Sequence, residues 1–210
     1  MESPIIKSIL FMHVFQVEQR ESVWIPDLIG KEAIRACVNW IKDKNSEVTW
    51  LFGGGHNYKQ NGLSWSSIYR SYLLSKYPEL IDNPKLKIID EQSFRGTDKR
   101  LAIDTRSEIK FLQDYLDSHK NQFDSINVIT ANPHISRIKI IYKNLGLNVH
   151  IFSAEDILGD SSQIHKSPSY LIFQKSEKWK VWITKWFDPK GNILEFIAKI
   201  MDKIKVFKKF

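Results

Sequence analysis

Short apolar runs alternate with helical stretches along most of this chain. The runs at residues 48–52, 86–89, 126–129 and 147–152 are short and mostly apolar, and residues 5–17 form a longer run with several β-branched side chains. Between them, apolar residues recur at intervals of three and four, which is the spacing of one face of an α-helix. Strands that are separated by helices pair in parallel, and a parallel sheet needs helices on both faces. This order therefore predicts a mostly parallel, five-stranded sheet between two helical layers.

The expected helices complete a three-layer arrangement. They are predicted at residues 30–44, 64–77, 104–119 and 133–145. Gly146 is placed to end the last of them in the C′ position. With right-handed crossovers, residues 1–158 form an α/β, Rossmann-like sandwich. Residues 159–169 are polar and contain a proline, as in a linker or loop, and residues 170–210 form a C-terminal helical extension.

Composition places the chain among ordinary globular proteins. Its 210 residues, 42% of them hydrophobic and 26% charged, suffice for one domain with an appended element. The only cysteine, Cys37, cannot form an intrachain disulfide or a cysteine-based zinc site, and we expect it to fill a small buried space. The sequence predicts no signal peptide, no bilayer-spanning segment and no metal site, so a cytoplasmic protein is expected.

The net charge of +7 reflects 31 Lys and Arg residues against 24 Asp and Glu residues. Part of this excess lies near the C-terminus, in Lys199, Lys203, Lys205, Lys208 and Lys209. We interpret it as a basic tail rather than a nucleic-acid-binding face. Because the chain has no nucleic-acid motif, nucleic acid is not expected as a partner.

The C-terminal extension has two parts with different patterns. Trp179, Trp182 and Trp186 are spaced three and four apart, so they share one helical face. We expect these tryptophans to dock their helix onto the sheet domain, and an exposed aromatic stripe for a partner is the alternative. Residues 192–210 are basic and amphipathic, which leaves open a peripheral contact with an acidic membrane, an oligomer interface or packing on the domain.

The most informative motif joins the strand at 126–129 to the helix that follows it. Thr130 and Asn132 lie in the turn, where Asn132 is placed to cap the helix, and His134 and Arg137 share the face of its first turn. Helix-start amides, an imidazole and a guanidinium would therefore converge beyond the end of a strand, where open α/β sheets bind ligands. This pattern favours a site for a phosphate or a carboxylate.

Two further motifs are expected at the same edge of the sheet. A glycine-rich turn follows the strand at 48–52 and consists of Gly53, Gly54, Gly55, His56 and Asn57. Glycines at a strand end let a backbone approach a ligand, although a flexible turn explains this run nearly as well.

The third motif begins the helix predicted at 104–119. Its candidate ligand-binding residues are Asp104, Thr105, Arg106 and Glu108, together with Glu91 and Ser93 after the preceding strand. Thr105 and the helix-start amides would hold a phosphate-like group while Arg106 neutralises it. An ordinary helix cap explains the same residues equally well. Glu91 and Ser93 would recognise ribose hydroxyls. Alternatively, the acidic residues at this strand end would only balance the charge of nearby arginines.

In order and spacing, these three motifs resemble the signatures of the YdcF/SanA/ElyC-like family, whose shared module is called domain of unknown function 218. The likeness covers roughly residues 30–152, and the pattern from Thr130 through His134 to Arg137 is its most specific part. The resemblance implies a Rossmann-like sheet with a polar pocket at the strand ends. It also implies a nucleotide-like ligand such as S-adenosylmethionine and a link to bacterial envelope processes.

Two hypotheses about function remain open at this point. In the first, the chain binds an anionic, nucleotide-like small molecule, with a nucleotide or S-adenosylmethionine as cofactor, and catalyses group transfer or phosphate-ester hydrolysis. His134 would then be the general acid or base, because an imidazole titrates near neutrality, and Arg137 would stabilise charge. In the second, a non-catalytic protein acts at a membrane surface or in an assembly through its C-terminal helices.

Overall fold

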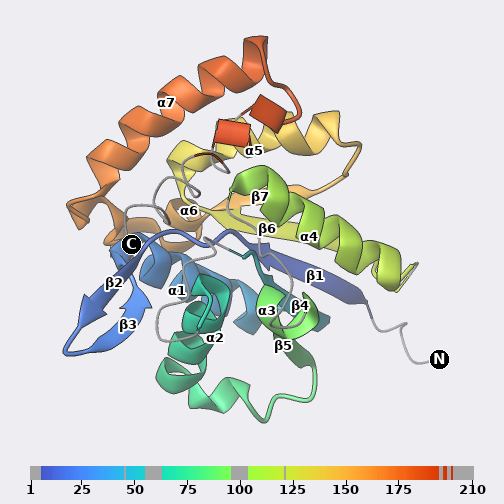
Figure 1. The fold of residues 1–210 in the computed structure, drawn as a ribbon. Helices are drawn as coiled ribbons and strands as arrows, with labels where there is room; N and C mark the ends of the chain where they lie inside the picture. Colours follow the sequence, from blue (N-terminus) through green and yellow to red (C-terminus); the bar gives the residue numbers. More distant parts are fainter. Residues whose placement is uncertain are drawn as a thin grey trace.

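The five expected strands form one parallel sheet in the order β5-β4-β1-β6-β7, as the computed structural model of the chain shows (Figure 1). The strands are β1 Lys7–Met12, β4 Glu47–Phe52, β5 Leu86–Asp90, β6 Ser125–Thr130 and β7 His150–Ser153. The structure describes residues 6–44, 46–54, 63–95, 104–120, 122–193, 196, 197 and 200.

The carboxyl ends of the central strands meet at one edge of the sheet. Met12 in β1 is level with Phe52 in β4 and with Ile129 in β6. The chain adds strands first on the β4 side of β1 and then on the β6 side, which creates a topological switch point between β1 and β6. Ligands of open α/β sheets bind outside the strand ends at such a point.

Helices cover both faces of the sheet, and the predicted Rossmann-like three-layer sandwich is confirmed. The covering helices are α1 Leu28–Lys42, α2 Trp65–Lys76, α4 Thr105–Ser118 and α5 Asn132–Asn144. Leu10 and Met12 pack in the core with α1 and α2, whereas Ile9 and Phe11 pack in the core with α4 and α5. This alternation follows from the two-residue period of a strand. Gly146 follows α5 with a φ of +72°, the left-handed conformation expected at C′.

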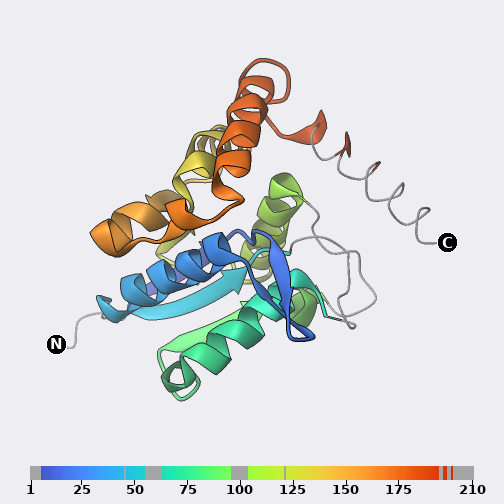
Figure 2. The ribbon, with the colours of Figure 1, turned by 90° about the vertical axis from the view of Figure 1, so that its left-hand side faces the viewer.

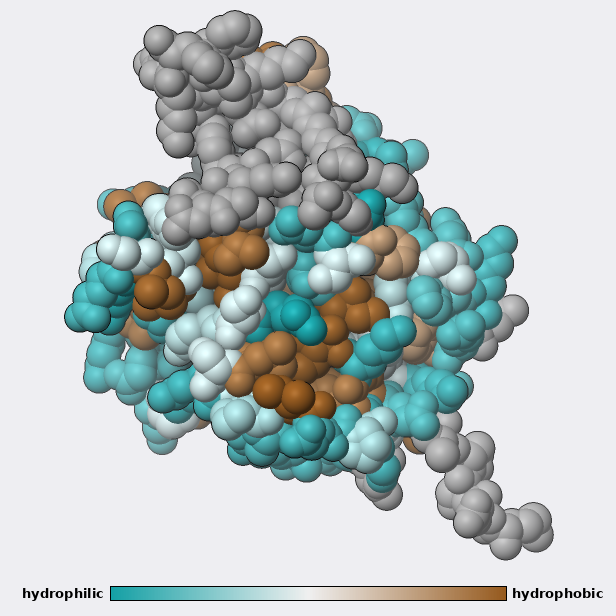
Figure 3. Space-filling view, turned by 60° about the horizontal axis from the view of Figure 1, so that its bottom comes forward, coloured by the Kyte–Doolittle hydropathy of each residue, from teal (hydrophilic) through white to brown (hydrophobic). Residues whose placement is uncertain are grey.

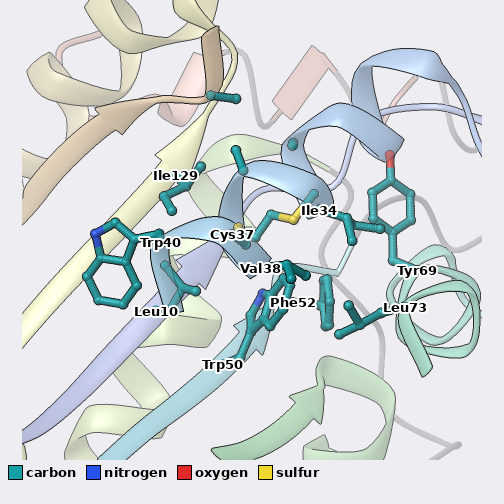
Figure 4. Close-up of a cluster of buried hydrophobic side chains, with 14 of the residues drawn as sticks. Leu10, Ile34, Cys37, Val38, Trp40, Trp50, Phe52, Tyr69, Leu73 and Ile129 are labelled. Carbon is teal, nitrogen blue, oxygen red and sulfur yellow. The ribbon is translucent and has the colours of Figure 1, made fainter. Parts of the chain in front are cut away.

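Cys37 lies in the core on the α1 side of the sheet. Figure 4 shows it in the cluster that also contains Ile34, Val38, Leu10 and Trp50. The side chain is fully buried, and this burial raises the pKa of the thiol. The expectation that Cys37 fills a small buried space is therefore confirmed.

The segment after β1 differs from the prediction of one long strand over residues 5–17. The strand ends at Met12, and the chain then leaves the sheet and forms a separate hairpin of β2 Val17–Arg20 and β3 Val23–Pro26. Glu21 and Ser22 make its tight turn with φ values of 47° and 70°. The polar stretch after β5 begins with the short helix α3 Glu91–Arg95.

The remaining elements lie between β7 and the C-terminus, apart from one short 3₁₀ helix after α2. They are η1 Pro78–Leu80, α6 Ala154–Leu158, η2 Gly159–Ser161, η3 Ile164–Lys166 and α7 Tyr170–Trp186. The backbone of Gln163, within residues 159–169, donates a hydrogen bond to Glu32 on α1 at 2.7 Å. The long helix α7 packs against α5 and lies outside the sheet layers (Figures 1 and 2).

The tryptophans of α7 are not buried against the domain. Trp179, Trp182 and Trp186 are between 55% and 65% exposed, so the prediction that they dock the helix is wrong. The buried positions of α7 are Tyr170, Glu177 and Thr184, each seven residues from the next. The helix therefore turns a face with a carboxylate and a hydroxyl inward, and its aromatic stripe faces outward.

The outer surface of the rest of the molecule is mixed in polarity. On the face that Figure 3 brings forward from the bottom of Figure 1, apolar residues form a central patch bordered by hydrophilic ones. Scattered apolar side chains such as Val23 and Ile81 are also exposed, as is common on globular proteins. Within the described ranges, no helix has the length and apolarity needed to cross a membrane.

Candidate functional site

A cavity of about 570 Å³ lies beside the carboxyl ends of β1 and β6, with α7 as one wall. Its polar lining includes Asp104, Thr105, Glu108, His134, Arg137, Glu177 and Lys180. Its apolar lining includes Phe15, Ile29, Trp65, Ile172 and Phe173. The cavity therefore brings together residues from two of the three predicted motifs, at the switch point of the sheet.

Arg137 is the centre of the polar wall. Its Nε donates to Glu177 Oε2 at 2.8 Å, and its Nη2 donates to Thr105 Oγ1 at 2.6 Å. Nη2 also lies 3.0 Å from Nε2 of His134. The side chains of Arg137 and Glu177 are only 8% and 1% exposed, so this is a buried ion pair. Lys180 Nζ adds a second cation, 2.8 Å from Glu177 Oε1.

His134 is held through both ring nitrogens. A guanidinium only donates hydrogen bonds, so Nε2 accepts from Arg137, and the ring proton lies on Nδ1, 3.1 Å from Thr130 Oγ1. Burial lowers the pKa of His134 well below its usual value, and the charges of Arg137, His13 and Lys180 lower it further. The imidazole is therefore neutral at physiological pH, and the prediction that it titrates near neutrality is wrong.

A second histidine, His13, lies directly after β1 and is fully buried. Its Nδ1 is 2.7 Å from Glu108 Oε2, and its Nε2 is 3.2 Å from the hydroxyl of Tyr142. The rings of His13 and His134 are in edge contact, with centroids 5.1 Å apart. Sequence reasoning missed His13, although a polar residue immediately after a buried strand was an available signal for the site.

Glu108 lines the cavity and also contacts Gly53, which is not among the described cavity-lining residues. A Cβ at Gly53 would lie 3.1 Å from the carboxyl carbon of Glu108, so the glycine is needed for this close approach. Glu108 binds His13 and also accepts a long hydrogen bond from Val14 N at 3.3 Å. The carbonyl of Gly54 accepts from Ser66 N at 3.1 Å, at the start of α2.

The remaining residues of the glycine-rich turn are not described by the structure. Gly55, His56 and Asn57 lie outside the described residues. Their predicted contact with a ligand stays a prediction.

The helix-start motif at α4 divides into a cap and a cavity wall. Asp104 Oδ1 accepts from Ser107 N at 2.8 Å, and Ser107 Oγ accepts from Asp104 N at 3.1 Å, which together form a capping box. Thr105 lines the cavity, but Arg106 Nη1 donates to the carbonyl of Lys190 at 2.6 Å, and Arg106 is not among the described cavity-lining residues. Its position therefore does not support the prediction that it neutralises a ligand held by Thr105.

The start of α5 is occupied by a carboxylate of the chain itself. The backbone N–H of Asn132 donates to both oxygens of Glu155, at 3.1 Å and 2.9 Å. Asn132 is the first residue of the helix, its side chain is exposed, and the N-cap is Ala131. The predicted capping by Asn132 is therefore wrong, and Glu155 satisfies this amide instead.

Glu91 and Ser93 contact residues at the carboxyl end of β5 and in α3. Glu91 is buried with its Oε1 3.0 Å from Arg95 Nε, and Ser93 Oγ donates to Asp90 at 2.5 Å. Neither residue is among the described residues that line the cavity. The contact of Glu91 with Arg95 agrees with the interpretation that this acidic residue balances the charge of a nearby arginine.

Asp27 is a cavity residue that the sequence did not reveal. Its Oδ1 accepts from Gly30 N at 2.9 Å and caps α1, while Ser169 Oγ lies 3.4 Å from Oδ2. Burial raises the pKa of Asp27 to about 6, although the bond from Gly30 opposes this shift. Asp27 therefore titrates just below neutrality at the edge of the cavity.

The cavity offers hydrogen bonds and ion pairs rather than a metal site. In the described ranges, no three His, Cys, Asp or Glu side chains are grouped so that they could hold a metal ion. Comparisons with protein-family models, with curated proteins and with solved structures found no match to this chain.

Proposed function

We propose that the chain binds an anionic, nucleotide-like small molecule in this cavity, with the anionic group on Arg137. The observation that carries the proposal is the buried contact between Arg137 and Glu177, with a donor–acceptor distance of 2.8 Å. A guanidinium fork fits a carboxylate or phosphate of a ligand as well as it fits a side-chain carboxylate. Glu177 belongs to α7, outside the sheet layers, so a ligand would take its place by local movement of one helix or one side chain.

Aromatic residues beside His134 suit the apolar part of such a ligand. Phe15 and Phe173 meet edge to face with ring centroids 5.6 Å apart, and Trp65 and Ile29 also line the cavity. Aromatic walls with a few polar groups are the usual lining of small-molecule sites. A planar base would pack on these rings, and Asp27 at the edge of the cavity would accept a hydrogen bond from a hydroxyl or an amino group.

The contacts of His134 favour binding over proton transfer. Both ring nitrogens are already hydrogen-bonded, and the ring is neutral at physiological pH. Group transfer or phosphate-ester hydrolysis, with S-adenosylmethionine or a nucleotide as the reactant, would require Nε2 to be released from Arg137 when the ligand arrives. The predicted resemblance to the YdcF/SanA/ElyC-like family implies the same class of ligand.

Thermal unfolding with a ligand panel tests the proposal. The panel holds AMP, ATP, S-adenosylmethionine, S-adenosylhomocysteine and inorganic phosphate. A ligand at about one hundred times its Kd stabilises the fold by about 2.7 kcal/mol, which raises the midpoint by about 5–10 °C in a chain of this length. We expect such a shift in the wild type and its loss in Arg137→Ala.

Two further variants make the test specific. Arg20→Ala removes an arginine that is 66% exposed on the β2–β3 hairpin, so it should keep the full ligand shift. Glu177→Gln removes the competing charge and should bind the same ligand more tightly than the wild type. The proposal fails if no ligand shifts the wild type, or if the shift survives in Arg137→Ala.

A further inference from the structure

The outward side of α7 is an apolar surface with no covering element among the described residues. We define the outer face of α7 as Leu171, Ile172, Trp179, Trp182 and Trp186, all of which are more than half exposed. Ile172 and Trp179 form the edge of this face beside the cavity, which they also line. At about 100° per residue these side chains fall within an arc of about 100° around the helix. The exposed Lys175 lies in the same arc, so the face is an apolar stripe that contains one lysine. A stripe with three tryptophans differs from single exposed apolar residues such as Val23 and Ile81.

The contacts of the inward side fix this orientation. Glu177 is bound to the buried Arg137, and Thr184, one heptad further along, is fully buried. Near the end of the helix, Arg106 Nη1 donates to the carbonyl of Lys190 at 2.6 Å. Rotating the tryptophans inward would break the buried ion pair, so the outer face stays directed away from the sheet domain.

The charges around the outer face have one sign. Between residues 170 and 193, every exposed charged side chain is a lysine, namely Lys175, Lys178, Lys185 and Lys190. The acidic residues of the same segment, Glu177 and Asp188, are both buried. Lys185 Nζ lies over the ring of Trp186, 5.2 Å from its centroid, so a cation and an aromatic ring are presented together.

We propose that the outer face of α7 binds the surface of an anionic lipid bilayer. Tryptophan prefers the interface between headgroups and acyl chains, and flanking lysines reach the lipid phosphates. A helix with an apolar stripe and a basic border lies in the plane of such an interface. A second copy of the chain is a poorer occupant, because a two-fold contact would bring identical lysine borders together. Ile172 and Trp179 also line the cavity, but the vesicle test uses no cavity ligand, so the two proposals are tested separately.

Vesicle co-sedimentation of the full chain tests this surface. One set of vesicles contains phosphatidylcholine mixed with phosphatidylglycerol, and the other contains phosphatidylcholine alone. We expect binding to the anionic vesicles, weakened by added salt, and little binding to the neutral ones. A large apolar side chain that moves from water to a fully apolar environment contributes about tenfold or more, but a tryptophan at the bilayer interface is only partly withdrawn from water. At about fivefold for each side chain, Trp179→Ser/Trp182→Ser/Trp186→Ser should lower the partition coefficient by about a hundredfold.

A matched control separates the stripe from exposed apolar residues in general. Val23→Ser/Ile81→Ser removes two side chains that are 61% and 60% exposed, and it should bind like the wild type. Because all five substituted residues are exposed, both variants should keep the wild-type circular dichroism and unfolding midpoint. Quenching of wild-type tryptophan fluorescence by brominated phosphatidylglycerol provides a readout that needs no variant.

Three results would overturn the proposal. The first is equal sedimentation with both kinds of vesicle or with neither. The second is undiminished binding of the triple tryptophan variant. The third is a wild-type dimer in sedimentation equilibrium that the triple variant converts to a monomer, which would assign the outer face of α7 to a second copy of the chain.

Discussion

Glu177→Ala should leave Arg137 as a buried cation without its main partner. The substitution removes the contacts of the Glu177 carboxylate with Arg137 Nε at 2.8 Å and with Lys180 Nζ at 2.8 Å. Breaking a buried ion pair costs about 3–5 kcal/mol. Thr105 and His134 still contact the guanidinium, and Lys180 is a third exposed and can turn to water. We therefore expect a loss near the lower limit, about 3 kcal/mol, or about 6–12 °C in the unfolding midpoint.

A small carboxylate should restore part of this stability. Glu177→Ala leaves a space of about the size of a carboxylate beside Arg137, and acetate or formate in that space would pair with the guanidinium again. Stabilisation by a bound anion grows with its concentration, so the midpoint of the variant should rise on titration with acetate while that of the wild type stays nearly constant. Urea unfolding at each acetate concentration measures both effects as free energies.

Controls decide whether the loss comes from the buried pair. Glu47→Ala removes a surface carboxylate that is 40% exposed and 3.5 Å from Lys7 Nζ, and it should change stability by less than about 0.5 kcal/mol. Glu177→Gln keeps an oxygen for Arg137 Nε and should fall between alanine and wild type. The reasoning is refuted if Glu177→Ala costs less than about 1 kcal/mol, or if acetate stabilises the variant and the wild type equally.

Two other substitutions test the core around the cavity. Burial raises the pKa of Asp27 from 3.8 to about 6, so its folded form binds more protons than its unfolded form in that interval and stability falls as pH rises through it. Asp27→Asn keeps a capping oxygen for Gly30 N but does not titrate. Relative to the wild type, its free energy of unfolding in urea should therefore be about 3 kcal/mol higher above pH 6 than at pH 4. Equal pH profiles of the two proteins would contradict the raised pKa of Asp27. Gly30→Ala would put a Cβ 2.0 Å from the buried hydroxyl of Tyr69 and should cost about 2–4 kcal/mol in the same assay. Asn39→Ala, on the exposed side of α1, is its control, and similar losses in the two variants would disprove the steric argument.

Local patterns were sufficient for the layers and the sheet. Apolar runs at strand spacing and at helix spacing predicted the five parallel strands and the covering helices α1, α2, α4 and α5 within a few residues. These signals lie within single segments of the chain, and each element buries a face that its own sequence specifies. The hairpin β2–β3 was missed because apolar residues continue beyond His13 as far as Val17, although the chain leaves the sheet after Met12.

The site was predicted in position but only partly in composition. Thr105, His134 and Arg137 meet as the strand–turn–helix pattern indicated, since the carboxyl ends of parallel strands share one edge. The contact between His13 and Tyr142 could not be predicted from spacing, because 129 residues separate them in the chain. Arg106 and Glu91 are charged residues near strand ends whose partners, Lys190 and Arg95, lie outside the cavity.

The sequence by itself determined the three layers, the edge of the sheet at which a site forms, and the helical face that collects Trp179, Trp182 and Trp186. Only the tertiary structure decided which way that face points. Periodicity identifies two sides of a helix but not which of them is buried, and here the choice is made by the buried contact of Glu177 with Arg137. The same contact places a carboxylate of the chain on the arginine of the proposed anion site and turns the tryptophans of α7 outward.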